Sequence, residues 1–308
     1  MGFLSRLRTC TIVYHSCSEP TPPVCYKNMH LSPTTIEDFR EAVWQHYRSA
    51  GRSMPWRNNP EPYWVIVSEI MLQQTQVDRV RPKFQAFIEA FPTIAILARA
   101  PLARVLELWS GLGYNRRAKF LWLAAQKVVA EYGGVLPQTV KELTMLPGIG
   151  ENTAGAIMAY AYNQPVVFVE TNVRTVYFHH FFTMASEVTD KELREVVAAT
   201  LDSEHPREWY WALMDYGSHL KKTAGGRLSQ SRHYKKQSPL KGSLREMRGR
   251  IVKSLTKGPL DTETLRSSVL ADDRFEPALQ NLLAEGMLER RGDKVSLTDH
   301  SVTHHNID

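Results

Sequence analysis

The feature that most constrains the fold is an almost unbroken series of helical patterns between Thr34 and about residue 219. Thr34 and Glu37 form a possible capping box, and apolar residues recur at three- and four-residue spacing as far as Tyr47. The one extended run, Val166 to Val169, leads directly to Glu170. Gly and Pro residues separate the further helices, which we expect at about 63–75, 79–90, 93–99, 102–109, 115–132, 139–145, 151–162, 172–182, 190–201 and 206–219. The pattern therefore predicts a mainly α fold.

The C-terminal part of the chain has a different organisation. Three helical patterns, at 244–255, 261–270 and 274–284, precede two short alternating runs on either side of Gly292-Asp293. Three helices and a hairpin are typical of a small winged-helix domain, whose segment 276–284 would enter a major groove or contact a protein. The predicted organisation is a disordered or spurious extension at 1–30, a helical domain at 31–220, a basic linker at 221–242, a winged-helix-like domain at 243–299 and a disordered tail at 300–308.

Composition and charge restrict the kind of protein. A hydrophobic content of 43% with 23% charged residues is ordinary for a globular chain, and no apolar run approaches the roughly 18 residues that a membrane span needs. Eleven Lys or Arg residues against Glu246 alone fall between residues 221 and 253, although the whole chain is only +6. This stretch is either a solvated linker or a surface that attracts a phosphate backbone. A cytoplasmic, bacterial nucleoid-associated protein without membrane contact is expected.

Two carboxylates and one turn carry the chemical signal. Glu69 lies within SEIMLQQT, and Glu170 lies within VVFVETN. Between them, LPGIG at residues 146–150 joins two predicted helices. Gly148 and Gly150 permit a tight turn whose backbone N–H groups, with the start of the next helix, can bind a phosphate oxygen. The alternative is an ordinary turn between helices, and the helical context together with the downstream acid favours DNA binding.

Residues 34 to about 220 resemble the helix-hairpin-helix DNA glycosylase superfamily, most closely its MutY-type adenine glycosylases. The resemblance rests on three motifs in the family's order, namely Glu69 followed by Met-Leu-Gln-Gln-Thr, the Gly-Leu-Gly-Tyr segment 111–114, and the hairpin 146–150 with an acid 23 residues beyond Pro147. The implied fold is a two-lobed helix-hairpin-helix glycosylase fold, here followed by the winged-helix-like domain.

The resemblance assigns catalytic roles to three residues. Glu69, partly buried by its apolar neighbours, would act as the general acid that protonates the departing base. Glu170 would stabilise the positive charge that develops on the sugar and help to orient water, assisted by Asn172. The family carries Asp where this chain has Glu170, and a displacement of about one bond length can cost roughly a hundredfold in rate. Capping of the following helix is the simpler role for Glu170.

The resemblance also assigns residues to DNA binding. Gln74 and Tyr114 would insert near the lesion while the target base is extruded, and Thr75 would contact the opposite base; the alternatives are exposed helix positions for Gln73 and Gln74 and a core position for Tyr114. The complete predicted set is Gln73, Gln74, Thr75, Tyr114, Pro147, Gly148, Ile149, Gly150, Asn152, Thr153, Lys221 and Lys222.

Three departures from the family pattern affect the expected chemistry. Related bifunctional enzymes have an imine-forming Lys where this chain has Asn152, and Lys141 and Lys119 lack motif support as substitutes, so a monofunctional enzyme is expected. The family commonly has a four-cysteine iron–sulfur loop after the segment that matches Ala212–Gly217. This chain has only Cys10, Cys17 and Cys25, so no cluster, metal or other cofactor is expected. The family's usual Nudix-like tail, which recognises 8-oxoguanine, is replaced here.

The sequence thus predicts a monomeric, monofunctional DNA glycosylase that removes a mispaired or damaged purine, most readily adenine, from double-stranded DNA during base excision repair. One alternative is a glycosylase for another base, such as hypoxanthine or an alkylated purine. The other is a non-catalytic protein that binds DNA structures, against which the two retained carboxylates argue, because negative charge beside DNA weakens binding.

Overall fold

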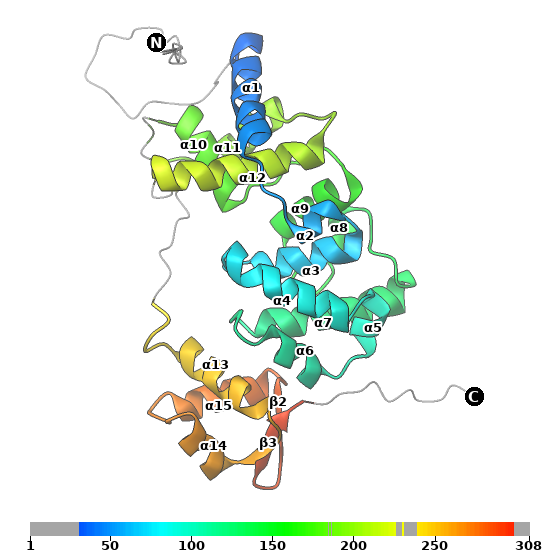
Figure 1. Ribbon diagram of the computed structural model, residues 1–308, viewed down its shortest axis with the longest axis vertical. Helices are drawn as coiled ribbons and strands as arrows, with labels where there is room; N and C mark the ends of the chain where they lie inside the picture. The colour runs from blue at the N-terminus through cyan, green and yellow to red at the C-terminus, as the bar shows by residue number, and fades with distance from the viewer. Residues whose placement is uncertain (1–30, 184, 186, 226–229, 231–238, 299–308) are drawn as a thin grey trace. The chain divides into compact units, whose positions relative to one another are not determined.

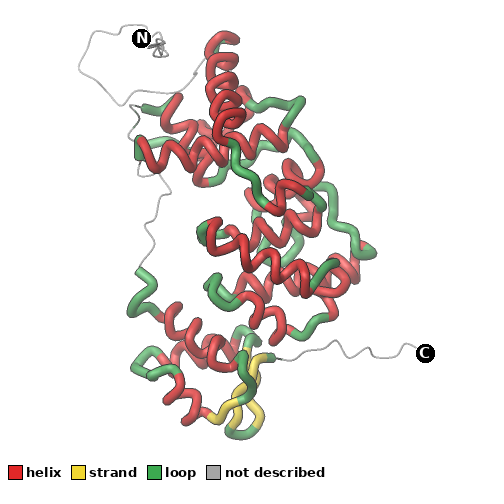
Figure 2. Tube along the Cα trace, viewed as in Figure 1, coloured by secondary structure: helices red, strands yellow, loops and turns green. Residues whose placement is uncertain are grey.

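A computed structural model describes residues 31–183, 185, 187–225, 230 and 239–298, and this part of the chain is mainly helical (Figures 1 and 2). It contains no helix that is both long enough and apolar enough to cross a membrane. The chain divides into two compact units that alternate along the sequence. Unit 1 comprises residues 1–52 and 169–234, and unit 2 comprises residues 53–168 and 235–308. The predicted segments 1–30 and 300–308 lie outside the described residues.

Unit 1 is built from α1 (Pro33–Ala50), α10 (Thr171–His180), α11 (Asp190–Thr200) and α12 (Pro206–Thr223). Its core is aromatic, because Phe39 of α1 meets the rings of Tyr177, Phe181 and Trp209 at centroid distances of 5.2, 4.8 and 5.9 Å. The α1 start differs from the predicted capping box. Ser32, rather than Thr34, accepts a hydrogen bond from the amide of residue 35 at 3.1 Å, because Pro33 occupies the first helical position.

The N-terminal part of unit 2 contains eight helices. The most apolar of them, α3, is buried at seven positions along its length. Tyr63 of this helix donates a hydrogen bond to the carbonyl of Phe91 at 2.6 Å and so fixes the end of α4. The bounds are α2 (Pro55–Asn58), α3 (Pro62–Leu72), α4 (Val77–Ala90), α5 (Ile94–Arg99), α6 (Leu102–Trp109), α7 (Arg116–Tyr132), α8 (Val140–Leu143) and α9 (Glu151–Tyr162).

Residues 239–298 form three helices and an antiparallel sheet with strand order β1-β3-β2. Buried Met247, Phe275, Leu279 and Val295 supply the apolar contacts that hold the helices on the sheet. The elements are α13 (Leu244–Leu255), β1 (Leu260–Asp261), α14 (Thr262–Ser268), α15 (Phe275–Ala284), β2 (Leu288–Arg291) and β3 (Lys294–Leu297). Three helices followed by a hairpin were predicted here, whereas β1 was missed because two residues carry no detectable alternation.

The helix bounds agree closely with the predictions, with two exceptions that matter for the site. The predicted helix 63–75 ends at Leu72, so the residues Gln73 to Thr75 lie in a turn. The predicted helix 206–219 continues to Thr223, so Lys221 and Lys222 belong to the last turn of α12 instead of a linker. Cations are favourable in this position because the helix dipole places partial negative charge there.

Candidate active site

Glu69 is presented by α3, a helix that the sequence specifies at its start. Pro62 occupies the first helical turn, and the Glu61 carboxylate accepts a hydrogen bond from the Trp64 amide at 3.2 Å. Glu69 itself is half-buried, between the fully buried Ser68 and Ile70. The side chain of Glu69 is therefore partly shielded from water, as expected, and its role as general acid stays a prediction.

The turn after α3 is stabilised by one long-range contact and contains one unusual backbone conformation. Gln73 donates from Nε2 to Thr153 Oγ1 at 3.3 Å and thereby ties the turn to α9. Gln74 has φ of 56°, in the left-handed region that non-glycine residues seldom occupy, and its side chain is exposed. Both glutamines therefore lie in a turn, not on a helix, as does Thr75, whose amide donates to the Leu72 carbonyl at 3.1 Å.

Tyr114 lies in a second turn of similar character. Gly111 and Gly113 have φ of 96° and 74°, and Tyr114 itself has φ of 49°. The indole N–H of Trp109 donates to the Gly113 carbonyl at 3.1 Å, which anchors the turn to the core. Tyr114 is half-buried. Two turns of this chain thus hold non-glycine residues in strained conformations, which is common where a loop must present a side chain to a ligand.

Arg117 joins these two turns, a role that was missed in the sequence. Its guanidinium donates to the carbonyls of Ile70, Met71, Gln73, Leu112 and Gly113 and to Thr75 Oγ1. Two of these carbonyls belong to the last turn of α3, where the partial negative charge of the helix favours a cation. Arg117 therefore caps the helix that carries Glu69 and fixes both turns at the same time.

Burial of the Arg117 guanidinium makes its charged form less favourable than it is in water. Burial lowers the pKa of Arg117 to about 10, which leaves it charged at neutral pH. Its charge is balanced by carbonyl dipoles and by the faces of Trp109 and Tyr114, each with its ring centroid 5.4 Å from the guanidinium carbon. The sequence contained a usable signal, since Arg117 precedes the buried Leu121 by one helical turn and so lies on the apolar face of α7.

The hairpin 146–150 joins α8 to α9, as predicted. Gly148 has φ of 78°, and a Cβ at this position would lie 2.8 Å from Phe120 Cβ, so the turn requires glycine for two reasons. Ile149 is buried and anchors the turn, while Gly150 is exposed at the start of α9. Pro147 and Thr153 are half-buried, and Asn152 is exposed in the first turn of α9. The backbone N–H groups at the start of a helix such as α9 suit an anionic ligand.

In unit 1, Glu170 and Asn172 stand at the start of α10. Glu170 has extended φ and ψ of −92° and 170° and occupies the N-cap position without a capping hydrogen bond from its side chain. Glu170 therefore stands at the capping position that the simpler alternative gave it, although its side chain accepts no capping hydrogen bond. The Lys221 ammonium of α12 donates to Asn172 Oδ1 at 2.6 Å. Four residues earlier on α12, Gly217 lies so near that an added Cβ would be 2.3 Å from the Asn172 carbonyl oxygen.

Burial and charge act in opposite directions on this group of side chains. Burial raises the pKa of Glu170 to about 7, and the nearby positive charge of Lys221 opposes that increase. Burial likewise lowers the pKa of Lys221, with Glu170 opposing. Each charge therefore favours the ionised form of the other. Lys222, by contrast, is exposed.

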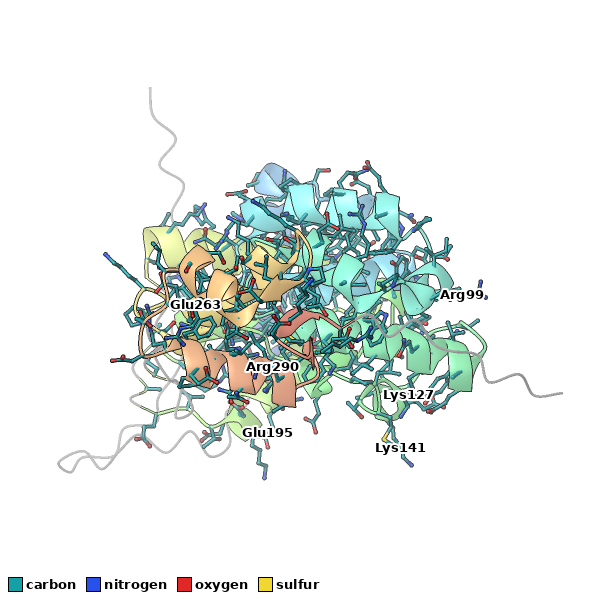
Figure 3. The ribbon with its side chains drawn as sticks, turned by 90° about the horizontal axis from the view of Figure 1, so that it is seen from below. Arg99, Lys127, Lys141, Glu195, Glu263 and Arg290 are labelled. Atoms are coloured by element: carbon teal, nitrogen blue, oxygen red, sulfur yellow. The ribbon has the colours of Figure 1, made fainter. Side chains whose placement is uncertain are left out.

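The two lysines named as formal nucleophile substitutes are differently placed. Lys141, labelled in Figure 3, is exposed on the short helix α8. Lys119 lies half-buried in α7, where burial lowers its pKa. Neither belongs to a predicted motif.

The segment that follows Gly217 does not fit an iron–sulfur cluster. Four thiolates are needed, and this segment supplies none, with Lys221 turned instead toward Asn172. Within the described residues no group of His, Cys, Asp and Glu is arranged to hold a metal ion.

Known proteins of one class are similar to this chain in sequence and in fold. Residues 67–199 match the family model described as HhH-GPD superfamily base excision DNA repair protein. The fold is also that of a thermostable thymine-DNA glycosylase (TM-score 0.54, 23% identity, 60% of this chain and 87% of that one). Endonuclease III in a non-covalent complex with DNA is similar as well (TM-score 0.55, 17% identity, 63% and 90%).

Sequence similarity is more specific. The adenine DNA glycosylase of Mycolicibacterium smegmatis is 34% identical over 289 residues, which cover 86% of this chain and 95% of that protein. The adenine DNA glycosylases of Buchnera aphidicola (Baizongia pistaciae) and Homo sapiens are 34% and 36% identical over 185 and 195 residues, covering 58% and 59% of this chain. The alignments span 52% and 36% of those two proteins. The chain therefore belongs to the adenine DNA glycosylase family of the helix-hairpin-helix superfamily, as its three motifs predicted.

Proposed function

We propose that this protein is a monofunctional DNA glycosylase that hydrolyses the N-glycosidic bond of mispaired adenine in double-stranded DNA. The observation that carries the proposal is the similarity to an adenine DNA glycosylase over 95% of that protein's length. The motifs that contain Glu69 and Glu170 support it, because they resemble the family's two acid segments. The protein would work as a monomer in the bacterial cytoplasm and without an iron–sulfur cluster, because its three cysteines are fewer than the four thiolates such a cluster needs.

The proposed mechanism divides the reaction between two carboxyl groups. Glu69 donates a proton to the adenine ring, so that the base leaves neutral as the bond to the sugar C1′ breaks. Glu170, ionised, stabilises the cationic sugar and orients the water whose oxygen then bonds to C1′. One proton of this water passes to the Glu69 carboxylate, which restores the acid. The products are free adenine and an abasic site. Since Asn152 is not an amine, the strand remains intact until alkali cleaves it.

DNA binding is assigned to the remaining predicted residues. The amides at residues 148–150 and the start of α9 bind a backbone phosphate, with Pro147, Asn152 and Thr153 beside them. Gln74 and Tyr114, held in strained turns, fill the space that the extruded nucleotide leaves. Thr75 contacts the opposite base, and Gln73 supports this turn through its hydrogen bond to Thr153. Lys222 is exposed and free to approach a phosphate.

A panel of duplexes tests the proposal. It contains adenine opposite 8-oxoguanine and opposite guanine, together with hypoxanthine, uracil and alkylated purines, and abasic sites are scored with and without alkali. We expect adenine to be released, with strand cleavage only after alkali. Glu69→Gln is expected to abolish release while DNA affinity stays nearly unchanged, because the amide cannot donate the same proton but keeps the shape. Release of another base only would favour the alternative specificity.

A further inference from the structure

The sharpest departure of unit 1 from the family pattern is Lys221, whose positive charge acts on Glu170, the acid proposed to stabilise the sugar. Where the family commonly begins its cysteine loop, α12 continues for six residues beyond Gly217 and carries Lys221 on its last turn. Lys221 is half-buried and directs its ammonium at Asn172 Oδ1, 2.6 Å away, although it belongs to the most basic part of the chain. A lysine that served only to attract DNA would extend into water, as Lys222 does.

The backbone is adapted to this contact. Gly217 and Lys221 are four residues apart and therefore share one face of α12. At Gly217 the helix approaches the Asn172 backbone so closely that a Cβ would collide with it at 2.3 Å. The glycine thus lets α12 lie against the start of α10, and the next turn of the same face delivers the Lys221 ammonium to Asn172. The close approach of Gly217 to the Asn172 backbone and the hydrogen bond from Lys221 to Asn172 Oδ1 are two separate observations, and both bring Lys221 to Asn172.

We propose that Lys221 is a positioning residue for the reaction, which holds Asn172 by a hydrogen bond and keeps Glu170 ionised by its positive charge. This inference rests on the proposed function, because an ionised Glu170 is needed only if it stabilises a cationic sugar. It also gives Lys221 a role distinct from that of Lys222, with which it was grouped as a DNA-binding residue.

The charged surroundings of Glu170 in unit 1 support this role. From α12, Lys221 is the charged side chain whose field acts on the Glu170 carboxylate. From α10 itself, Arg174 forms an ion pair with Asp190 at the start of α11, with 2.9 Å between nitrogen and oxygen. Burial already raises the pKa of Glu170, so loss of the Lys221 charge raises it further. Less of the carboxyl group is then ionised at any given pH near neutrality, and the rate falls with it.

The test measures single-turnover adenine release between about pH 5.5 and about pH 9 for four proteins. They are wild type, Lys221→Gln, Lys221→Arg and the matched control Lys222→Gln. Lys221→Gln keeps a donor for Asn172 but removes the charge, so its acid limb should move up by about one pH unit, with roughly tenfold slower release below that limb. Lys221→Arg should retain most of the wild-type profile, and Lys222→Gln should retain its shape while DNA affinity weakens.

A profile for Lys221→Gln with the same acid limb as Lys222→Gln would overturn the proposal. A second readout needs no activity, namely the titration of the Glu170 carboxyl carbon by NMR, with the resonance identified from a Glu170→Gln spectrum. The Glu170 pKa should be higher in Lys221→Gln than in wild type, and equal values would refute the inference. If wild type releases no adenine, the proposed function fails, and the NMR titration still decides the role of Lys221.

Discussion

Removal of the Arg117 guanidinium should be the most damaging single change in unit 2. Arg117→Met keeps a long apolar side chain but leaves six acceptors without their donor, and two of these acceptors are carbonyls in the last turn of α3. A hydrogen bond to a charged group contributes about 1.5–3 kcal/mol, and such bonds to one guanidinium are far from additive. Since the cation is also released from an unfavourable buried position, we expect a net destabilisation of about 3–5 kcal/mol.

Thermal unfolding followed by circular dichroism measures this effect, with Arg116→Met as the matched control because Arg116 is 57% exposed. A loss of 3–5 kcal/mol corresponds to a decrease of roughly 10 °C in the melting temperature of a unit of this size. Arg117→Lys should lie between wild type and Arg117→Met, because an ammonium keeps the charge but cannot span acceptors on two turns. The interpretation that Arg117 joins the two turns and caps α3 is refuted if Arg117→Met and Arg116→Met melt within about 2 °C of each other.

Three further changes test the site residue by residue. Glu170→Asp restores the family's side chain. If the position of the carboxylate matters, single-turnover kinetics should show a change in the rate of base release of up to roughly a hundredfold, in either direction. An unchanged rate would mean that the pocket tolerates both side-chain lengths. Asn152→Lys should create an adduct with abasic DNA that borohydride traps, and no trapped adduct in a folded variant would count against the assignment of this position. Gly148→Ala should destabilise the hairpin by about 1–3 kcal/mol and weaken DNA binding in a filter assay, because a Cβ there meets Phe120 at 2.8 Å. The control Gly150→Ala has open space around the added Cβ and should melt like wild type.

Local patterns were sufficient to predict most of the helices. The segment 115–132 carries apolar residues at helical spacing and ends at a glycine pair, and α7 spans Arg116–Tyr132 with Gly133 in the left-handed conformation. In contrast, α2 was missed, because the four residues Pro55–Asn58 are too short to show any periodicity. The end of α3 was placed three residues late, since Gln73 to Thr75 continue the helical pattern and only tertiary contacts turn the chain there.

The site was predictable where a residue acts through its own motif and unpredictable where it acts through partners distant in sequence. Glu69 and Glu170 could be proposed because each stands in a short recognisable segment. Arg117 and Lys221 looked like members of ordinary basic clusters, and their roles depend on which of two neighbouring cations faces the interior. Burial decides this in both pairs, since Arg117 is buried where Arg116 is exposed, and Lys221 is half-buried where Lys222 is exposed.

The central claim, that this chain removes mispaired adenine by hydrolysis without lyase chemistry, is tested most directly by the products of one single-turnover reaction. A duplex with adenine opposite 8-oxoguanine or guanine is incubated with wild type, and the base is identified by mass spectrometry while the strand is analysed before and after alkali. The mechanism predicts free adenine, an intact strand before alkali and a cleaved strand after it, with no borohydride-trapped adduct. Cleavage without alkali together with a trapped adduct, or no adenine release from either duplex, would contradict it.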